Sequence, residues 1–206
     1  MLKAVIFLFA VALILWGCAG KSVTLGPNNS APQTSRKWAQ SSPQSATGEL
    51  RYKAPDGWTA ERPSSDMRAA QYKLPKVELD SEDALLVLYY FGQGQGGTAQ
   101  ANIDRWVNQM QQPDGRPSSE RARTENITVN GLKVITVDVS GTYSGGMSPT
   151  GGMSGGKSGD KSNYRLRAAI VETPKGSYFV KLTGPEKTVA HWDQAYVDYI
   201  KSFEFK

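Results

Sequence analysis

The sequence has one cysteine, Cys18, and one histidine, His191. A single cysteine excludes an intramolecular disulfide, and zinc sites built from several Cys and His ligands are not available. The carboxylates of Asp80, Glu82 and Asp83 are close in sequence but lack the spacing of an EF-hand loop, so we interpret them as a solvated approach to a strand rather than calcium ligands. We therefore expect neither a metal nor a cofactor.

The sequence also lacks an apolar run long enough to span a bilayer as a helix, which takes about 20 residues. Its longest run, residues 4–16, holds 13 uncharged residues after Lys3 and has the length of the apolar core of an export signal. The run ends in LWGC, which resembles a bacterial lipobox. The resemblance implies a signal peptide at residues 1–17, a diacylglyceryl thioether on Cys18 and an acylated new N-terminus.

The residue after Cys18 is Ala19 rather than Asp. By analogy with enterobacterial sorting, this favours the outer membrane in a host with two membranes. Several acyl chains anchor a protein far more firmly than one. The lipobox resemblance therefore implies a lipid-anchored protein of the bacterial cell envelope, at the outer membrane and facing the periplasm.

Acidic residues are absent from the first 47 residues, which hold Lys3, Lys21, Arg36 and Lys37. Because four of the 24 basic residues lie there and none of the 19 acidic ones does, the net charge of residues 48–206 is only +1. A nucleic-acid-binding domain would instead cluster basic residues on one face, so we expect no nucleic-acid partner. Residues 18–47 are polar and lack apolar periodicity, which predicts a disordered tether after the lipidated cysteine.

Residues 48–206 have the size of one domain, and its strands and helices can be located by apolar pattern. Residues 50–54 and 67–74 read as strands, and residues 84–91 (ALLVLYYF) are apolar throughout, which predicts an interior strand covered on both faces. A helix is predicted over residues 99–111, where one stripe holds Ile103, Trp106, Val107 and Met110.

Hairpins dominate the second half of the domain. Asn130-Gly131 lies between alternating strands within residues 123–139 and predicts a type I′ turn. Residues 164–172 and 177–183 flank TPKG and predict a second hairpin, and residues 187–203 predict a final amphipathic helix. Antiparallel hairpins with two amphipathic helices indicate an α+β fold: an antiparallel sheet of about seven strands with helices on both faces.

Residues 151–158, GGMSGGKS, fit the phosphate-binding pattern G-x-x-x-x-G-K-[ST] letter for letter. That chemistry needs a helix immediately after the Lys-Ser pair, since the helix start supplies the amides. A strand is predicted there instead. Ser154 and Lys157 also have the spacing of a serine acyl-enzyme pair, which needs a helix start too. We interpret residues 144–163 as a flexible Gly-rich loop between two strands and expect no nucleotide partner.

A second glycine pattern, GQGQGG, places Gly92, Gly94, Gly96 and Gly97 between a predicted strand and a predicted helix. A dinucleotide site would need a parallel βαβ return, whereas an antiparallel hairpin follows. Two interpretations remain. The segment is a tight turn, or its amides and the following helix start form a weak anion site.

Trp58 lies in a turn beside Pro55, Gly57 and Pro63, outside any helical core pattern. It either closes one end of the fold or is presented to a partner. The candidate contact residues for a partner or ligand are Trp58, Arg62, Ser64, Ser65, Arg68 and the glycines Gly92, Gly94, Gly96 and Gly97.

The early P-x-G-W segment, the antiparallel set, the Trp-bearing middle helix and the final amphipathic helix resemble the PsbP-like superfamily. The segments RPSSDMRAAQY, YYFGQGQGG and NIDRWVNQMQQPDG are similar to a group of uncharacterised bacterial lipoproteins with that fold. The resemblance covers residues 48–206. It implies an α-β-α sandwich used as a binding or assembly module, without a common catalytic residue.

The residues leave three functions open. The first is a non-enzymatic envelope lipoprotein, an adaptor that contacts an envelope protein or a cell-wall component. The second is a protein that binds a small ligand, an anion or a divalent ion through residues 92–97. The third is a hydrolase that would have to use His191, although no nucleophile-elbow motif accompanies that residue.

Overall fold

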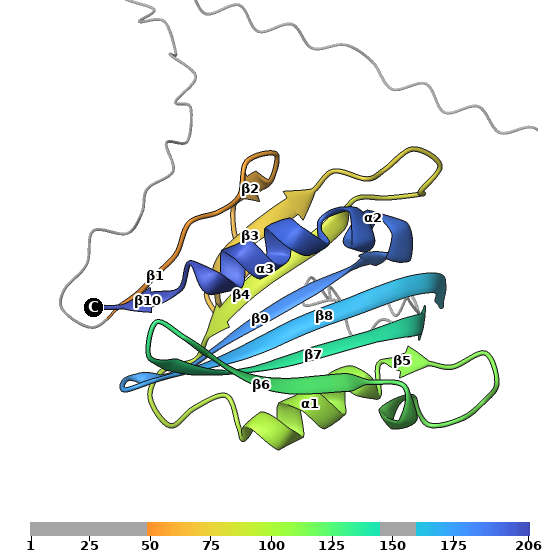
Figure 1. The fold of residues 1–206 in the computed structure, drawn as a ribbon. Helices are drawn as coiled ribbons and strands as arrows, with labels where there is room; N and C mark the ends of the chain where they lie inside the picture. Colours follow the sequence, from red (N-terminus) through yellow and green to blue (C-terminus); the bar gives the residue numbers. More distant parts are fainter. Residues whose placement is uncertain (1–48, 145–159) are drawn as a thin grey trace, which may run out of the picture. The chain divides into compact units, whose positions relative to one another are not determined.

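The computed structural model describes residues 49–144 and 160–206 (Figure 1). The predicted signal peptide, the lipidation of Cys18, the tether, and the pair Ser154 and Lys157 lie outside the described residues.

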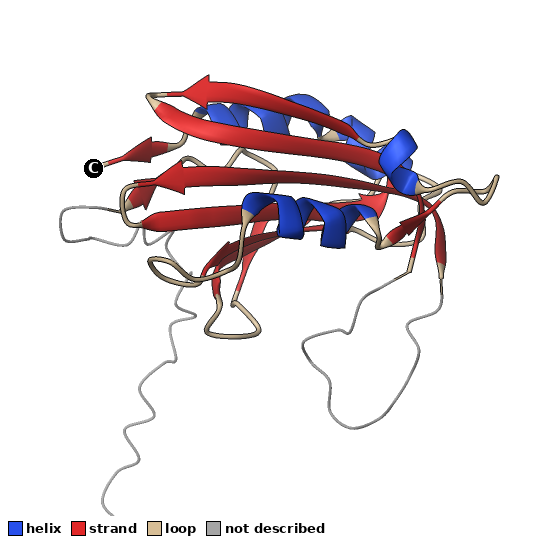
Figure 2. Cartoon of the chain, turned by 90° about the horizontal axis from the view of Figure 1, so that it is seen from below, coloured by secondary structure: helices blue, strands red, loops and turns tan. Residues whose placement is uncertain are grey.

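The described residues form an antiparallel sheet of eight strands, in the order β2-β3-β4-β9-β8-β7-β5, with β6 also paired to β7. The strands are β2 (Thr59–Glu61), β3 (Arg68–Leu74), β4 (Ala84–Tyr90), β5 (Met110–Gln111), β6 (Arg123–Val129), β7 (Leu132–Tyr143), β8 (Lys161–Thr173) and β9 (Gly176–Pro185). A separate pair joins β1 (Leu50–Arg51) to β10 (Glu204–Phe205). Figure 2 shows the long strands of the sheet beside the helices that pack on them.

Helices pack on both faces of the sheet, so there are two apolar cores. On the α1 face, α1 (Ala99–Val107) packs against β7, β8 and β9. On the opposite face, which we name the α3 face, α2 (Glu186–His191) and α3 (Asp193–Lys201) build a larger core with strands from both halves of the sheet. A short 3-10 turn, η1 (Ser118–Glu120), precedes β6.

The structure confirms the predicted fold class and most of the predicted elements. The apolar segment 84–91 forms β4 between β3 and β9, with Ala84, Leu86 and Leu88 fully buried. Asn130 and Gly131 have φ values of 48° and 81° at the β6–β7 turn. These positive angles at both positions are what a type I′ turn requires.

Four boundaries differ from the sequence predictions. Strand β8 begins at Lys161, so the last residues of the predicted loop 144–163 belong to a strand. The first strand is only β1, because its residues pair with β10 and not with the main sheet. The middle helix ends at Val107, and Met110 then pairs with Tyr143 of β7. The final helix is interrupted at Trp192, whose φ and ψ are −91° and 10°. The indole Nε1 of Trp192 donates to the carbonyl of Pro75 across 2.9 Å, so a tertiary contact holds the residue where the helix breaks.

Candidate functional site: a convergence of cationic and phenolic side chains

Five polar side chains from five elements converge on the α1 face. We name them the donor cluster: Arg68 (β3), Tyr89 (β4), Arg105 (α1), Tyr143 (β7) and Lys181 (β9). The Lys181 Nζ lies 3.2 Å from the Tyr143 hydroxyl. The guanidinium of Arg68 lies 5.8 Å from the centre of the Tyr89 ring. The charges of Arg68 and Arg105 act on both Lys181 and Tyr89, and Tyr89 acts in turn on Tyr143.

Lys181 is placed by the alternation of β9. Phe179 belongs to the core on the α1 face, and Lys181 is two residues farther along the strand, so its side chain starts from the same face. Its strand neighbours, Val87 on β4 and Ala168 on β8, offer no charge. The amine therefore reaches past apolar neighbours to donate to Gln109 Oε1 at 2.5 Å, in the turn after α1.

Arg68 is nine-tenths buried, which is unusual for an arginine. A register shift between Arg68 and Ala70 marks a bulge at the start of β3, a device that re-aims side chains. The Nη1 of Arg68 donates to Gln71 Oε1 at 2.6 Å, and Gln71 in turn donates to Glu61. Its Nε is buried without a hydrogen-bond partner among the described residues.

Arg105 connects the donor cluster to the glycine segment. Its Nη2 donates to Asn102 Oδ1, and the Nδ2 of the buried Asn102 donates to the carbonyls of Gly96 and Thr98, both at 2.8 Å. The Thr98 hydroxyl accepts from the Ala101 amide and caps α1. Asn102 thus fixes the glycine segment and one of the cluster's arginines at the same time.

The three cations of the donor cluster form no ion pair within the described residues. Within residues 49–144 and 160–206, no ion pair includes Arg68, Arg105 or Lys181. All 19 acidic residues of the sequence fall inside these ranges, so the remaining segments hold no carboxylate side chain to supply. Glu61, which approaches Arg68 through Gln71, pairs with Lys73 instead.

The protonation states follow from this environment. Burial lowers the pKa of Lys181 to about 8, and the charges of Arg105 and Arg68 push it in the same direction. Burial raises the pKa of Tyr89 against the opposing charges of Arg68 and Arg105, and it raises the pKa of Tyr143 as well. Both phenols are therefore protonated at neutral pH and are able to donate hydrogen bonds.

The lowered pKa of Lys181 predicts a pH dependence of stability in the absence of bound anions. Between about pH 8 and the ordinary lysine pKa of 10.5, the unfolded chain binds more protons than the folded one, so stability rises with pH. We expect the free energy of unfolding to increase by about 1 kcal/mol from pH 8 to pH 9, relative to a Lys181→Met variant. Urea titrations of both proteins at pH 7, 8 and 9 measure this difference.

Comparing the protein with its Lys181→Met variant cancels the contribution of every other group to the pH dependence of stability. The titratable and charged side chains that face Lys181 are kept in both proteins, namely Arg68, Tyr89, Arg105 and Tyr143. Parallel pH profiles for the two proteins would show that Lys181 titrates normally.

The structure brings together part of the contact set suggested by the sequence. The Tyr90 amide donates to the Met67 carbonyl, so the segment of Arg62, Ser64, Ser65 and Arg68 lies at the same end of the sheet as residues 92–97. Arg62 and Ser64 are exposed, whereas Ser65 is half-buried with no partner for its hydroxyl among the described residues.

The glycine segment is closely packed. Gly92, Gly94, Gly96 and Gly97 all have positive φ values. A Cβ on Gly96 would lie 2.7 Å from the Phe179 ring, and one on Gly176 would lie 2.9 Å from the Gly92 carbonyl. These contacts support the tight-turn interpretation. The segment also accepts a hydrogen bond from Asn102, which in turn accepts one from Arg105.

Trp58 is separate from the donor cluster. It is half-buried on the α3 face, where its ring lies 5.8 Å from Tyr72 and 5.2 Å from Tyr199. Its Nε1 is buried and has no acceptor in the described part of the chain. The packing fits a side chain that closes one end of the core.

The acidic segment and His191 form no shared site. Asp80 accepts from the Thr188 amide and hydroxyl, Glu82 accepts from Lys161 and Tyr164, and Asp83 accepts from the Lys76 amide. Each of the three carboxylates accepts hydrogen bonds from a different part of the chain, and the described residues contain no metal-ligand cluster. His191 is exposed at the end of α2, with its ring edge-on to Trp192 at 4.9 Å.

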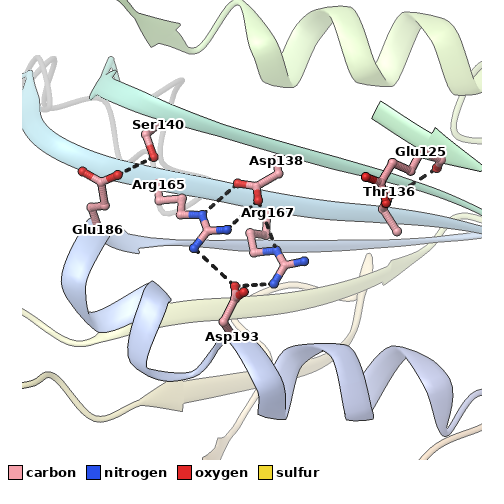
Figure 3. A network of polar contacts seen from close by, with 8 residues as sticks. All are labelled: Glu125, Thr136, Asp138, Ser140, Arg165, Arg167, Glu186 and Asp193. Atoms are coloured by element: carbon pink, nitrogen blue, oxygen red, sulfur yellow. Dashed lines mark hydrogen bonds and ion pairs between the residues drawn. The ribbon is translucent and has the colours of Figure 1, made fainter. Parts of the chain in front are cut away.

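A second charged group, on the α3 face, pairs two arginines with two aspartates (Figure 3). Arg165 donates to both carboxylate oxygens of Asp138, at 2.8 and 2.5 Å, and Arg167 donates to Asp193. Arg165 also lies 3.3 Å from Asp193. Two arginines facing two aspartates leave no charge for a ligand, so we interpret this network as a link between β7, β8 and α3.

Sequence reasoning singled out Arg68 but missed Tyr89, Arg105, Tyr143 and Lys181. One signal was available for Lys181. In the strand sequence YFVKLTG, a lysine interrupts an apolar run at a position that alternation places beside Phe179. Nothing in the local sequence marks the other three residues, because their place in the cluster depends on which strands are neighbours in the sheet.

The chain matches no protein-family model and no curated protein. Its fold resembles that of LpqN, described as involved in cell envelope biogenesis of Mycobacterium tuberculosis, with 10% identity over 78% of this chain and 84% of that one and a TM-score of 0.49. It also resembles a Pseudomonas aeruginosa protein of unknown function, described as a putative regulator, with 14% identity, coverage of 70% and 94%, and a TM-score of 0.42.

The cyanobacterial PsbP protein of Synechocystis is a further similar structure, with 11% identity, coverage of 80% of this chain and 96% of that one, and a TM-score of 0.43. A PsbP protein is thus among the solved structures that this chain resembles, as the sequence resemblance implied. At these identities and TM-scores the likeness carries no argument about function. In the described part of the chain, no helix has the length and apolar character needed to cross a bilayer.

Proposed function

We propose that the protein is a lipid-anchored, non-enzymatic binding module of the bacterial cell envelope, and that its domain binds an anionic group of an envelope component. The anchor is the lipid on Cys18, and residues 18–47 act as the tether. A flexible chain of this length reaches about 30 Å on average. The domain would therefore stay near the membrane and be free to turn its binding surface toward a partner.

The observation that carries the proposal is the uncompensated charge of the donor cluster. Burying a cation costs several kcal/mol unless a partner is supplied, yet Arg68 is nine-tenths buried and Lys181 is half-buried, both without a carboxylate in the described residues. An anion bound between Arg68, Arg105 and Lys181 would remove this cost. The same groups would then supply affinity, because charge-assisted hydrogen bonds are the strong ones.

The test is a calorimetric titration of the full lipidated chain in detergent with citrate, inorganic phosphate and polyglutamate. We expect at least one of these anions to bind, and Arg68→Gln to weaken that binding by about ten- to hundredfold, as the loss of a charge-assisted hydrogen bond would do. Arg51→Gln serves as the matched control, because Arg51 is exposed on β1, outside the main sheet. It removes the same charge without touching the cluster.

Two results would count against the proposal. One is that none of the three anions binds to the protein although the protein is folded. The other is an equal weakening by Arg68→Gln and Arg51→Gln, because binding would then follow overall charge and not the cluster.

A further inference from the structure

We propose that the group recognised by the donor cluster is a phosphate monoester rather than a carboxylate. This inference rests on the proposed function and names the ligand chemistry of the same site. The argument concerns the number of donors, their geometry and their charge.

The donor cluster offers many hydrogen-bond donors. Arginine and protonated lysine side chains only donate, and the phenols of Tyr89 and Tyr143 stay protonated because burial raises the pKa of each. A carboxylate presents two oxygens and one negative charge. A phosphate monoester presents three terminal oxygens and a charge of about −1.5 to −2 at pH 7. The monoester therefore satisfies more of the donors and more of the positive charge.

The unpaired edge of Arg68 has the geometry for an oxyanion. Its Nη1 is occupied by Gln71, and within the described residues neither Nε nor Nη2 has a hydrogen bond. Nε and Nη2 form one edge of the guanidinium. Arg165 uses this same edge to donate to the two oxygens of Asp138. In Arg68 the buried Nε of this edge has no acceptor among the described residues, and Arg–phosphate pairs are frequently bidentate through such an edge.

Two members of the donor cluster belong to stacked aromatic pairs. Tyr89 stacks with Phe91, and Tyr143 stacks with Tyr164, each with ring centres 6.0 Å apart. Tyr89, Phe91 and Tyr143 remain partly accessible. These rings provide apolar surface for the carbon skeleton that carries the phosphate.

The experiment compares ligands of similar charge but different geometry on the full lipidated chain in detergent. The probes are glycerol 3-phosphate, inorganic phosphate and the dicarboxylate glutarate. We expect glycerol 3-phosphate to bind about tenfold or more tightly than glutarate, because only the phosphate carries three terminal oxygens on a single centre. Inorganic phosphate shows whether the phosphate group alone is enough for binding. The aromatic rings contribute to affinity only when the phosphate carries a carbon skeleton.

The variant Arg68→Lys tests the guanidinium edge. It keeps the charge but removes the two-donor geometry, so we expect glycerol 3-phosphate to bind about tenfold more weakly while glutarate changes less. A thermal melt of each variant verifies that it is folded. Tyr143→Phe provides a second variant that keeps the ring and removes one donor.

A pH series adds a readout that a structural role would not produce. The affinity for glycerol 3-phosphate should rise from pH 5.5 to pH 7 as the ester gains its second charge near pH 6. It should fall again above pH 8 as Lys181 loses its proton. The groups that face Lys181 are the same in every measurement of the series, namely Arg68, Tyr89, Arg105 and Tyr143.

The outcomes separate this inference from the proposed function. If glutarate binds as tightly as glycerol 3-phosphate, or if Arg68→Lys binds the ester as well as the unmodified protein does, the phosphate assignment is overturned and the anion-binding function stands. If no anion binds, both fail. Preference for the ester, loss in Arg68→Lys and a bell-shaped pH profile together support the assignment.

Discussion

Replacement of Tyr199 by alanine is expected to destabilise the domain by about 3–5 kcal/mol, the range for removing a fully buried aromatic side chain. Tyr199 is fully buried on the α3 face, with ring centres of Tyr52, Trp58 and Phe203 at 5.4, 5.2 and 4.9 Å. Its loss would leave a cavity at the centre of the aromatic cluster that joins α3 to the first strands. Urea denaturation at neutral pH measures the change.

The companion substitution Tyr199→Phe is expected to act in the opposite direction. The Tyr199 hydroxyl is buried without a partner among the described residues, and burial raises its pKa well above the ordinary value. Removing an unpaired buried hydroxyl relieves a desolvation penalty of about 1–3 kcal/mol. We therefore expect Tyr199→Phe to leave stability unchanged or to raise it by about 1 kcal/mol.

Tyr90→Phe is the matched control for this substitution. The Tyr90 hydroxyl donates to the Lys175 carbonyl at 2.7 Å, so its removal should cost about 1 kcal/mol. A loss of stability in Tyr199→Phe as large as that in Tyr90→Phe would mean that the Tyr199 hydroxyl has an acceptor after all.

Asp138→Ala is expected to destabilise the domain by about 2–3 kcal/mol. Asp138 accepts two hydrogen bonds from Arg165, and Arg167 lies within 3.9 Å of it (Figure 3). Removing it leaves two arginines that are only 18% and 14% exposed, with Asp193 as their remaining carboxylate. A fully buried pair broken in this way costs about 3–5 kcal/mol, and the value here is lower because Asp138 and Asp193 are partly exposed.

Glu172→Ala provides the contrast, since Glu172 pairs with Lys133 at 3.3 Å where both side chains are largely exposed. Such pairs contribute about 0–1 kcal/mol. Guanidinium chloride is a salt and would screen these charges, so both variants are denatured with urea. Equal effects of the two substitutions would show that the Figure 3 network is no more than a set of surface ion pairs.

The hairpins and the covered strand could be predicted because their signals are local. Asn130-Gly131 requires a turn with positive φ at both residues, and the two flanking strands pair with each other whatever the rest of the chain does. The apolar run of β4 indicates cover on both faces, and the structure supplies it. The break at Trp192 was not predictable, because it depends on the Pro75 carbonyl, which lies 117 residues away in sequence.

The candidate site was predictable only in part. The sequence singled out Arg68 and the glycine segment, and it placed both at a strand end. It gave no reason to join them to Arg105 or to Tyr143. Trp58 was considered as a partner contact together with Arg68, yet Trp58 packs in the core of the α3 face, whereas the bulge before Ala70 turns Arg68 toward Tyr89 on the α1 face.

The sequence by itself therefore determined the class of fold and the position of most elements, because the periods of two residues in strands and 3.6 in helices can be recognised in the sequence. Only the tertiary structure decided the donor cluster. Its members come from positions 68 to 181, and they meet because β4 pairs with β9 and α1 covers β7, β8 and β9. Strand order is a property of the assembled sheet, and so is the lack of an ion pair to Arg68, Arg105 or Lys181 within residues 49–144 and 160–206.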